Sequence, residues 1–237
     1  MKTKILLLTG LGFAAWLAGC GTSGLSRHEV AGGSYPNYIL NLPTTNSAPD
    51  RPPLRKPIHL AVAQVGESAP PRALLNKLES NRDSIASVVG LPAPAETEHR
   101  YYAPKDNSQN KQVDFVSRVQ QLCRLSKSMH ADYLFICGGD MTWWNSPNLL
   151  RVFDITIVGG MVLPSTKVNV EGRAAGALVD AATCEPVLML STDATRSGFS
   201  PTFYIDEKTD GQRVALRDEL TASLADELLK KIASQGK

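Results

Sequence analysis

The chain has 237 residues, enough for one domain with an appended segment, and 25 Lys and Arg against 23 Asp and Glu give a formal net charge of +2. Two lysines and no acid lie within the first nineteen residues, so the remainder is formally neutral, with 23 charges of each sign. A neutral chain without a basic cluster argues against nucleic acid as a partner.

The N-terminal segment has the pattern of a secretory signal. Two lysines precede an apolar run from Ile5 to Leu17, and this run is shorter than the roughly 20 residues that span a bilayer. The run ends in Leu17-Ala18-Gly19-Cys20, which resembles the lipobox of bacterial lipoproteins. This resemblance implies that residues 1–19 are removed as a signal peptide and that Cys20 carries the lipid.

Residues 20–57 are predicted to form a lipidated tether, because Pro, Gly, Ser, Thr and Asn dominate them and such a composition buries little apolar surface. Gly, not Asp, follows Cys20, and in Gram-negative lipoproteins this implies sorting to the outer membrane. A few tether residues are apolar and could dock on the domain or on a partner: Tyr35, Tyr38, Ile39 and Leu42.

A single α/β domain is predicted over residues 58–234. Its first half predicts a buried strand over 58–65 and then a helix that begins after Pro70-Pro71 and ends at Gly90. The apolar face of this helix would hold Leu74, Leu75, Leu78, Ile85, Val88 and Val89. A weak strand over 97–103, a helix over 112–129 and a strongly apolar strand over 131–139 follow.

The second half predicts a strand-like apolar segment over 149–163 and an antiparallel hairpin of strands 168–181 and 186–195. A helix over 213–233, with leucines spaced by four, closes the domain. The predicted fold class is therefore α/β: a mixed sheet with packed helices, an antiparallel hairpin in the second half and a C-terminal helix.

The three remaining cysteines, Cys123, Cys137 and Cys184, have no CxxC spacing, and their number is odd. Separate buried thiols are favoured over a bridge, although one disulfide is possible in an oxidising compartment. The four histidines lie far apart in the sequence, so neither a metal site nor a cofactor is expected.

Four segments carry a family resemblance. They are Ala131-Asp132-Tyr133-Leu134, Asn148-Leu149-Leu150, Ile155-Thr156-Ile157-Val158-Gly159-Gly160 with Pro164, and Ala177-Leu178-Val179-Asp180. With the long final helix, they resemble the rhombotarget lipoproteins of bacteria. The order of elements is also similar to the periplasmic domain of curli-secretion channel lipoproteins and to the N-terminal domain of the Tol-system propeller protein.

The family name implies a C-terminal sorting tail that a rhomboid protease reads: a Gly-Gly motif, an apolar span and a basic end. Residues 230–237 read KKIASQGK and do not follow this pattern. Processing of that kind is therefore not expected for this chain.

Two regions are candidate sites. Asp140 and Trp143 follow the predicted strand 131–139, and α/β sheets bind ligands beyond the carboxyl ends of their strands; the alternative is a turn whose aromatic side chains cover a sheet edge. Ile155, Ile157, Val158 and Met161 could insert into a membrane or contact a second copy; the alternative is a buried central strand with a Gly-Gly turn.

No pattern of a catalytic site is present, since the chain lacks GxSxG, HExxH and phosphate-binding glycine motifs. The sequence therefore predicts a non-enzymatic outer-membrane lipoprotein that presents an α/β domain, in the periplasm or at the surface, to an envelope protein partner. Two alternatives remain: a small-ligand or glycan-binding lipoprotein, and an oligomeric component of a secretion channel.

Overall fold

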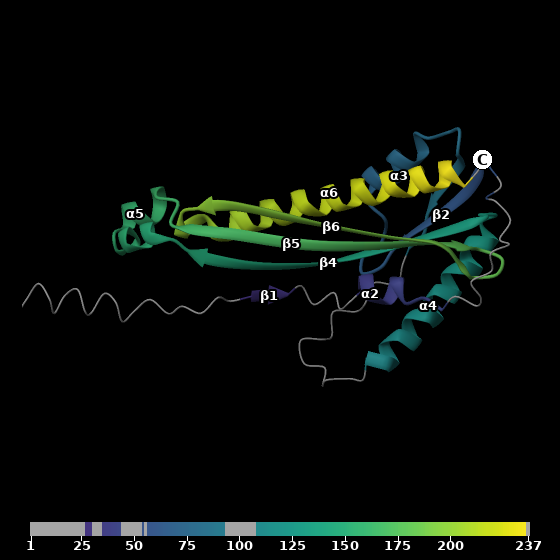
Figure 1. The fold of residues 1–237 in the computed structure, drawn as a ribbon, viewed down its shortest axis with the longest axis horizontal. Helices are drawn as coiled ribbons and strands as arrows, with labels where there is room; N and C mark the ends of the chain where they lie inside the picture. The colour runs from purple at the N-terminus through teal and green to yellow at the C-terminus, as the bar shows by residue number, and fades with distance from the viewer. Residues whose placement is uncertain (1–26, 30–34, 44–53, 55, 93–107, 236–237) are drawn as a thin grey trace, which may run out of the picture.

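The computed structural model describes residues 27–29, 35–43, 54, 56–92 and 108–235. Six strands form one mixed sheet in the order β3-β2-β4-β5-β6, with β1 beside β4 (Figure 1). β2 runs parallel to β3 and β4, whereas β4, β5 and β6 are successively antiparallel. The strands are β1 (Arg27–Glu29), β2 (Ile58–Gln64), β3 (Ile85–Gly90), β4 (Tyr133–Pro147), β5 (Thr166–Asp180) and β6 (Pro186–Ser200).

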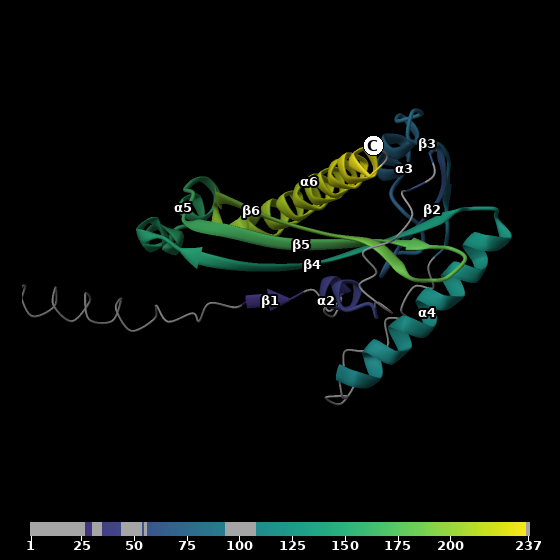
Figure 2. The same ribbon diagram turned by 45° about the vertical axis from the view of Figure 1, so that its right-hand side comes forward.

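Helices cover both faces of this sheet, as the two ribbon views show (Figures 1 and 2). They are α2 (Tyr35–Leu40), α3 (Arg72–Glu79), α4 (Ser108–Ser128), α5 (Ile157–Val162) and α6 (Ile205–Ser234). Two short 3-10 helices, η1 (Leu149–Ile155) and η2 (Thr202–Tyr204), lie at the same end as α5. The predicted class, α/β with a mixed sheet, an antiparallel hairpin and a C-terminal helix, is confirmed.

The apolar side chains of the strands alternate between two layers. On one face, Leu134 and Ile136 of β4 pack against Ile39 of α2 and Phe115 of α4. On the other face, Phe135 of β4 packs with residues of α3 and α6. This alternation is the period-2 geometry of a strand that is buried on both sides.

Glycines let α6 lie close to the sheet. A Cβ atom on Gly172 would come within 2.7 Å of the Leu220 side chain of α6. One on Gly176 would come within 3.3 Å of the Leu224 side chain of α6 and within 2.6 Å of the Phe135 ring of β4. The mostly apolar α6 face, which includes Leu216, Leu220, Leu224 and Leu228, is buried along this line.

The predicted helix from Pro70 to Gly90 was wrong in its second half. The helix α3 ends at Glu79, and residues 85–90 form the parallel strand β3, in which Ile85 lies opposite Ile58. Short apolar runs fit a helical face and a strand equally well. The β-branched residues Ile85, Val88 and Val89 favour a strand, and β2 provides the partner.

The strand predicted over 131–139 does not end at Gly138-Gly139 but continues to Pro147, since β5 pairs with β4 over its full length. These glycines allow close approach instead of forming a turn. A Cβ atom on Gly138 would meet Tyr35 at 3.3 Å and Ile39 at 3.4 Å, and one on Gly139 would lie 2.9 Å from the Arg173 carbonyl oxygen.

The segment predicted to be a strand over 149–163 forms η1 and α5 instead. Local caps explain this. The Asn148 side chain accepts a hydrogen bond from the Leu150 N–H at 2.8 Å, and the Thr156 hydroxyl accepts one from the Gly159 N–H at 3.0 Å. Such side-chain caps satisfy the first N–H groups of a helix, and here they outweigh the β-propensity of the isoleucines and valines.

Part of the predicted tether belongs to the domain. β1 pairs with β4, and Tyr35, Ile39 and Leu42 in and after α2 are buried. The preference for separate buried thiols was wrong for Cys123 and Cys184, which form a disulfide. The signal peptide, Cys20 and the weak strand predicted over 97–103 lie outside the described residues.

Candidate functional site

Most of the exposed large apolar side chains among the described residues gather at one end of the molecule, around η1, α5 and η2. Leu149 is 94% exposed, Ile157 73% and Val158 71%. We call this set the apolar tip: Leu149, Leu150, Val152, Phe153, Ile155, Ile157, Val158, Met161, Val162, Phe199, Phe203 and Tyr204. Contiguous exposed apolar surface of this kind marks interaction sites.

The apolar tip is a folded element with polar groups inside. The Asp154 carboxylate accepts hydrogen bonds from the hydroxyls of Ser165, at 2.9 Å, and Thr202. These bonds tie η1 to the start of β5 and to η2. The carboxylate and the two hydroxyls thus lie between these segments, and the apolar side chains of the tip are exposed.

Two glycines hold α5 against its neighbours. A Cβ atom on Gly159 would lie 2.0 Å from the Phe153 carbonyl oxygen, and one on Gly160 would lie 2.8 Å from the Phe203 ring. The Gly-Gly pair therefore packs a short helix against η1 and η2, and it is not the turn that the alternative interpretation assumed.

All four residues predicted for membrane insertion or self-association lie in the apolar tip. Ile155, Ile157, Val158 and Met161 are exposed, so the structural alternative of a buried central strand was wrong. Sequence reasoning missed three aromatic residues of the tip, Phe199, Phe203 and Tyr204. Phe199 lies at the end of β6 and the other two follow it, and they join η1 and α5 only through the tertiary fold.

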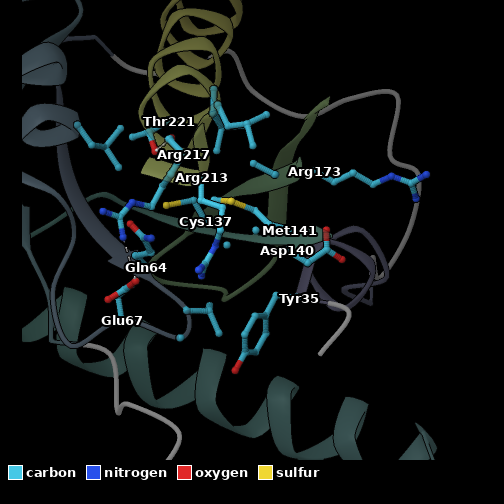
Figure 3. Close-up of a pocket in the computed structure, with 18 residues that line it drawn as sticks. Tyr35, Gln64, Glu67, Cys137, Asp140, Met141, Arg173, Arg213, Arg217 and Thr221 are labelled. Atoms are coloured by element: carbon cyan, nitrogen blue, oxygen red, sulfur yellow. Dashed lines mark hydrogen bonds and ion pairs between the residues drawn. The ribbon is translucent and has the colours of Figure 1, made fainter. Parts of the chain in front are cut away.

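A second candidate is a cavity of about 210 Å³ beyond the carboxyl end of β2, where β4 loses its parallel partner. Figure 3 shows Arg213 and Arg217 entering from α6 above Cys137 and Met141 of β4, with Tyr35 below. Glu67, after β2, lies 3.9 Å from the Arg217 guanidinium. The two arginines were not found from sequence, because helix α6 brings them to the sheet.

The structure does not bring Asp140 and Trp143 together. The two residues are three positions apart in the regular strand β4, so their side chains face opposite sides of the sheet. Asp140 lines the cavity and lies opposite Arg173 in the register of β4 and β5. Trp143 lies on the α6 side, where the Arg213 guanidinium sits 4.3 Å from its ring centroid.

Cys137 lines the cavity but is buried. Burial disfavours the charged thiolate and raises the pKa of Cys137 to about 12. The thiol donates a weak hydrogen bond to the Ala63 carbonyl oxygen at 3.7 Å. A protonated, desolvated thiol is a poor nucleophile, so Cys137 serves the core of the domain.

Two aspartates, Asp180 and Asp132, hold backbone N–H groups in place. The Asp180 carboxylate accepts hydrogen bonds from the backbone N–H groups of Ala182, at 2.7 Å, and Thr183, at 3.1 Å. Asp180 therefore caps the turn between β5 and β6, as an aspartate before a turn commonly does. Asp132 similarly accepts a hydrogen bond from the His59 N–H at 2.9 Å.

Within the described residues, no group of three or more His, Cys, Asp and Glu side chains is placed to hold a metal ion. Among the helices that the structure describes, none combines the length and apolar character needed to cross a bilayer.

No protein-family model and no curated protein sequence matches this chain. Solved structures do resemble it. A minor lipoprotein from Acinetobacter baumannii has a TM-score of 0.34 and 8% identity over 75% of this chain and 92% of its own. The PelC dodecamer from Paraburkholderia phytofirmans has a TM-score of 0.32 and 12% identity over 85% and 94%.

Lipoprotein GNA1162 from Neisseria meningitidis has a TM-score of 0.27 and 15% identity over 74% of this chain and 99% of its own. These likenesses are too distant to assign the chain to a family or to transfer a function, and neither the rhombotarget family nor any other is shown by them.

Proposed function

We propose that this protein is a non-enzymatic, lipid-anchored lipoprotein of the outer membrane that presents its α/β domain to an envelope protein partner. The observation that carries the proposal is the segment Leu17-Ala18-Gly19-Cys20, directly after a basic and apolar leader. Several acyl chains on one residue anchor a protein stably, whereas a single chain is marginal.

The Cys123–Cys184 disulfide supports export. Such bonds persist in oxidising compartments and are rare in the cytosol. This one joins α4 to the turn between β5 and β6, at the end of the sheet away from the apolar tip.

A non-enzymatic role is supported by the structural tasks of the polar groups. Asp132, Asp154 and Asp180 accept hydrogen bonds that hold backbone or hydroxyl groups, and Cys137 is a buried thiol. None of these groups is paired with a base that would activate it, which nucleophilic catalysis requires.

Labelled palmitate tests the anchor. Cells that express the wild-type chain should incorporate the label into this protein, and a Cys20→Ser variant should not. A Cys137→Ser variant is the matched control, because it removes a buried cysteine and should keep the label. Label that persists in Cys20→Ser would overturn the proposal.

Density fractionation tests the membrane assignment. The wild-type protein should sediment with the outer membrane, and a Gly21→Asp variant should move to the inner-membrane fraction, because Asp after the lipidated cysteine favours retention there. In vivo crosslinking of the anchored wild-type protein would then identify the envelope partner.

Small-ligand binding is the second candidate, and the cavity beside Arg213 and Arg217 favours it. Its volume of about 210 Å³ is below the roughly 300–1,000 Å³ of most small-molecule sites. We therefore rank ligand binding below anchoring. Titration of the wild-type protein and an Arg217→Ala variant with small anions, followed by calorimetry, tests whether the cavity binds a ligand.

A further inference from the structure

We propose that the apolar tip inserts into the same membrane leaflet that holds the acyl chains on Cys20. This inference rests on the proposed lipid anchor and extends it: the protein contacts the bilayer at two points, one covalent and one formed by the fold.

The direction of β1 places its N-terminal end, Arg27, on the side of the apolar tip. β1 runs antiparallel to β4, with Arg27 opposite Trp144 and Glu29 opposite Thr142. Going back along the chain from Glu29 to Arg27 therefore leads toward Pro147, the end of β4 from which η1 begins. Both ribbon views show β1 beside the half of β4 nearer α5 (Figures 1 and 2).

The length of chain before β1 limits where the bilayer can lie. Arg27 is seven residues after Cys20, so their Cα atoms are at most about 25 Å apart. The end of β4 is three residues beyond Trp144, or about 10 Å. The opposite end, at Tyr133, is eleven residues from Trp144, or about 36 Å. The anchor reaches the level of the tip but not the far end of the sheet.

The chemistry of the tip suits hydrocarbon and the adjoining lipid headgroups. Between residues 148 and 165 the charged side chains are Arg151 and Asp154, and Asp154 is turned inward to Ser165 and Thr202. Arg151 is exposed and long enough to keep its guanidinium among headgroups while its stem lies in apolar surroundings. Tyr204 is suited to the interface for the same reason.

Insertion of the tip into the bilayer also explains why the isolated domain has so much exposed apolar area. Such a surface is an aggregation liability in a free soluble domain. A bilayer held within reach by the Cys20 acyl chains covers it without any further protein.

The test uses the full-length lipidated protein reconstituted in phosphatidylcholine vesicles. Val158→Cys in the tip and Val113→Cys in α4 form a matched pair, since the two valines are 71% and 68% exposed. Each introduced thiol is labelled with an environment-sensitive fluorophore, and Cys137 is not labelled because it is buried. Ile157→Cys, at a position 73% exposed, provides a second tip label if one variant folds poorly.

Brominated acyl chains in the vesicles quench a fluorophore that enters the hydrocarbon. We expect severalfold stronger quenching at positions 157 and 158 than at position 113. Equal, weak quenching at all three positions, with the protein still bound to the vesicles, would overturn the insertion and leave the anchor intact.

Two other outcomes also reject the proposal. A blue-shifted tip label that brominated lipid does not quench, and that depends on protein density in the membrane, would show that a second copy covers the tip. Wild-type protein that does not partition into vesicles at all would reject the lipid anchor itself.

Discussion

Cys123 in α4 and Cys184 in the turn between β5 and β6 are joined by a disulfide across 61 residues, with their Cα atoms 5.9 Å apart. Cys184 adopts a positive φ of 61°, a conformation that a tight turn requires. The bond thus fixes the helix that covers one face of the sheet to the hairpin beneath it.

Removing this bond should lower the stability of the domain. In the chain-entropy model a crosslink over 61 residues contributes about 4 kcal/mol to the free energy of unfolding. A Cys123→Ala, Cys184→Ala double variant should therefore unfold at lower denaturant, and reductant should no longer shift its midpoint. An unchanged wild-type midpoint on adding reductant would contradict this prediction.

Substitution of Gly176 should destabilise the packing of β5 against the Phe135 ring of β4 in the layer beneath α6. An alanine Cβ there would lie 2.6 Å from the Phe135 ring, and overpacking of a core typically costs about 1–3 kcal/mol. Gly211 in α6 is the control: its Cβ would meet nothing within 4 Å. Gly211→Ala should stabilise by about 0.5–1 kcal/mol. Equilibrium unfolding of both variants measures the contrast.

Arg213 should contribute more to stability than Arg217, although the two are one turn apart in α6. Arg213 lies over the Trp143 ring, and such a contact is worth about 0.5–2 kcal/mol. Arg217 and Glu67 form a half-exposed pair at 3.9 Å, a type worth about 0–1 kcal/mol. Comparing Arg213→Met with Arg217→Met in denaturant tests the order; a larger loss for Arg217 would reverse it.

Cys137 should be unreactive in the native protein. Burial raises its pKa from 9.0 to about 12, so at pH 8 the thiol stays protonated and out of reach of thiol reagents. In denaturant, the same thiol should react readily at pH 8. Fast modification of the native protein would show that the Cys137 environment is open.

The same pKa gives a pH dependence with a definite sign. The folded state holds the Cys137 proton more tightly than the unfolded state, so this stabilisation is complete below about pH 9 and is lost as the pH rises toward about 12. A Cys137→Ala variant should be less stable at neutral pH, because a buried side chain is truncated. Its stability should fall less steeply than that of the wild type over this range.

Much of the domain was predictable from local pattern. The strand at 58–64, the helix α4, the β5–β6 hairpin and α6 follow from buried apolar runs and from regular helical spacing. The Asp180 cap was also predictable, because an aspartate before a turn bonds the N–H groups that follow it. These elements depend on neighbours that are close in the sequence.

The wrong secondary-structure predictions fall on segments whose structure depends on whether a strand distant in the sequence pairs with them. Ile85 becomes a strand residue because β2 lies beside it, and Gly138-Gly139 continues β4 because β5 pairs past it. The segment around Ile157 is the opposite case: no strand of the described residues pairs with it, and the caps at Asn148 and Thr156 favour helices. A high apolar content alone does not tell a buried strand from an exposed helix.

The amino-acid sequence by itself predicts a signal peptide and a lipid-bearing Cys20, and both stay predictions. It also determined the class of the domain, because short-range periodicity carries this information. Only the tertiary structure decided that Cys123 meets Cys184, that Asp140 and Trp143 face apart, and that the apolar run around Val158 is exposed with Phe203 beside it. These relationships join residues distant in the chain, and long-range pairing and packing determine them.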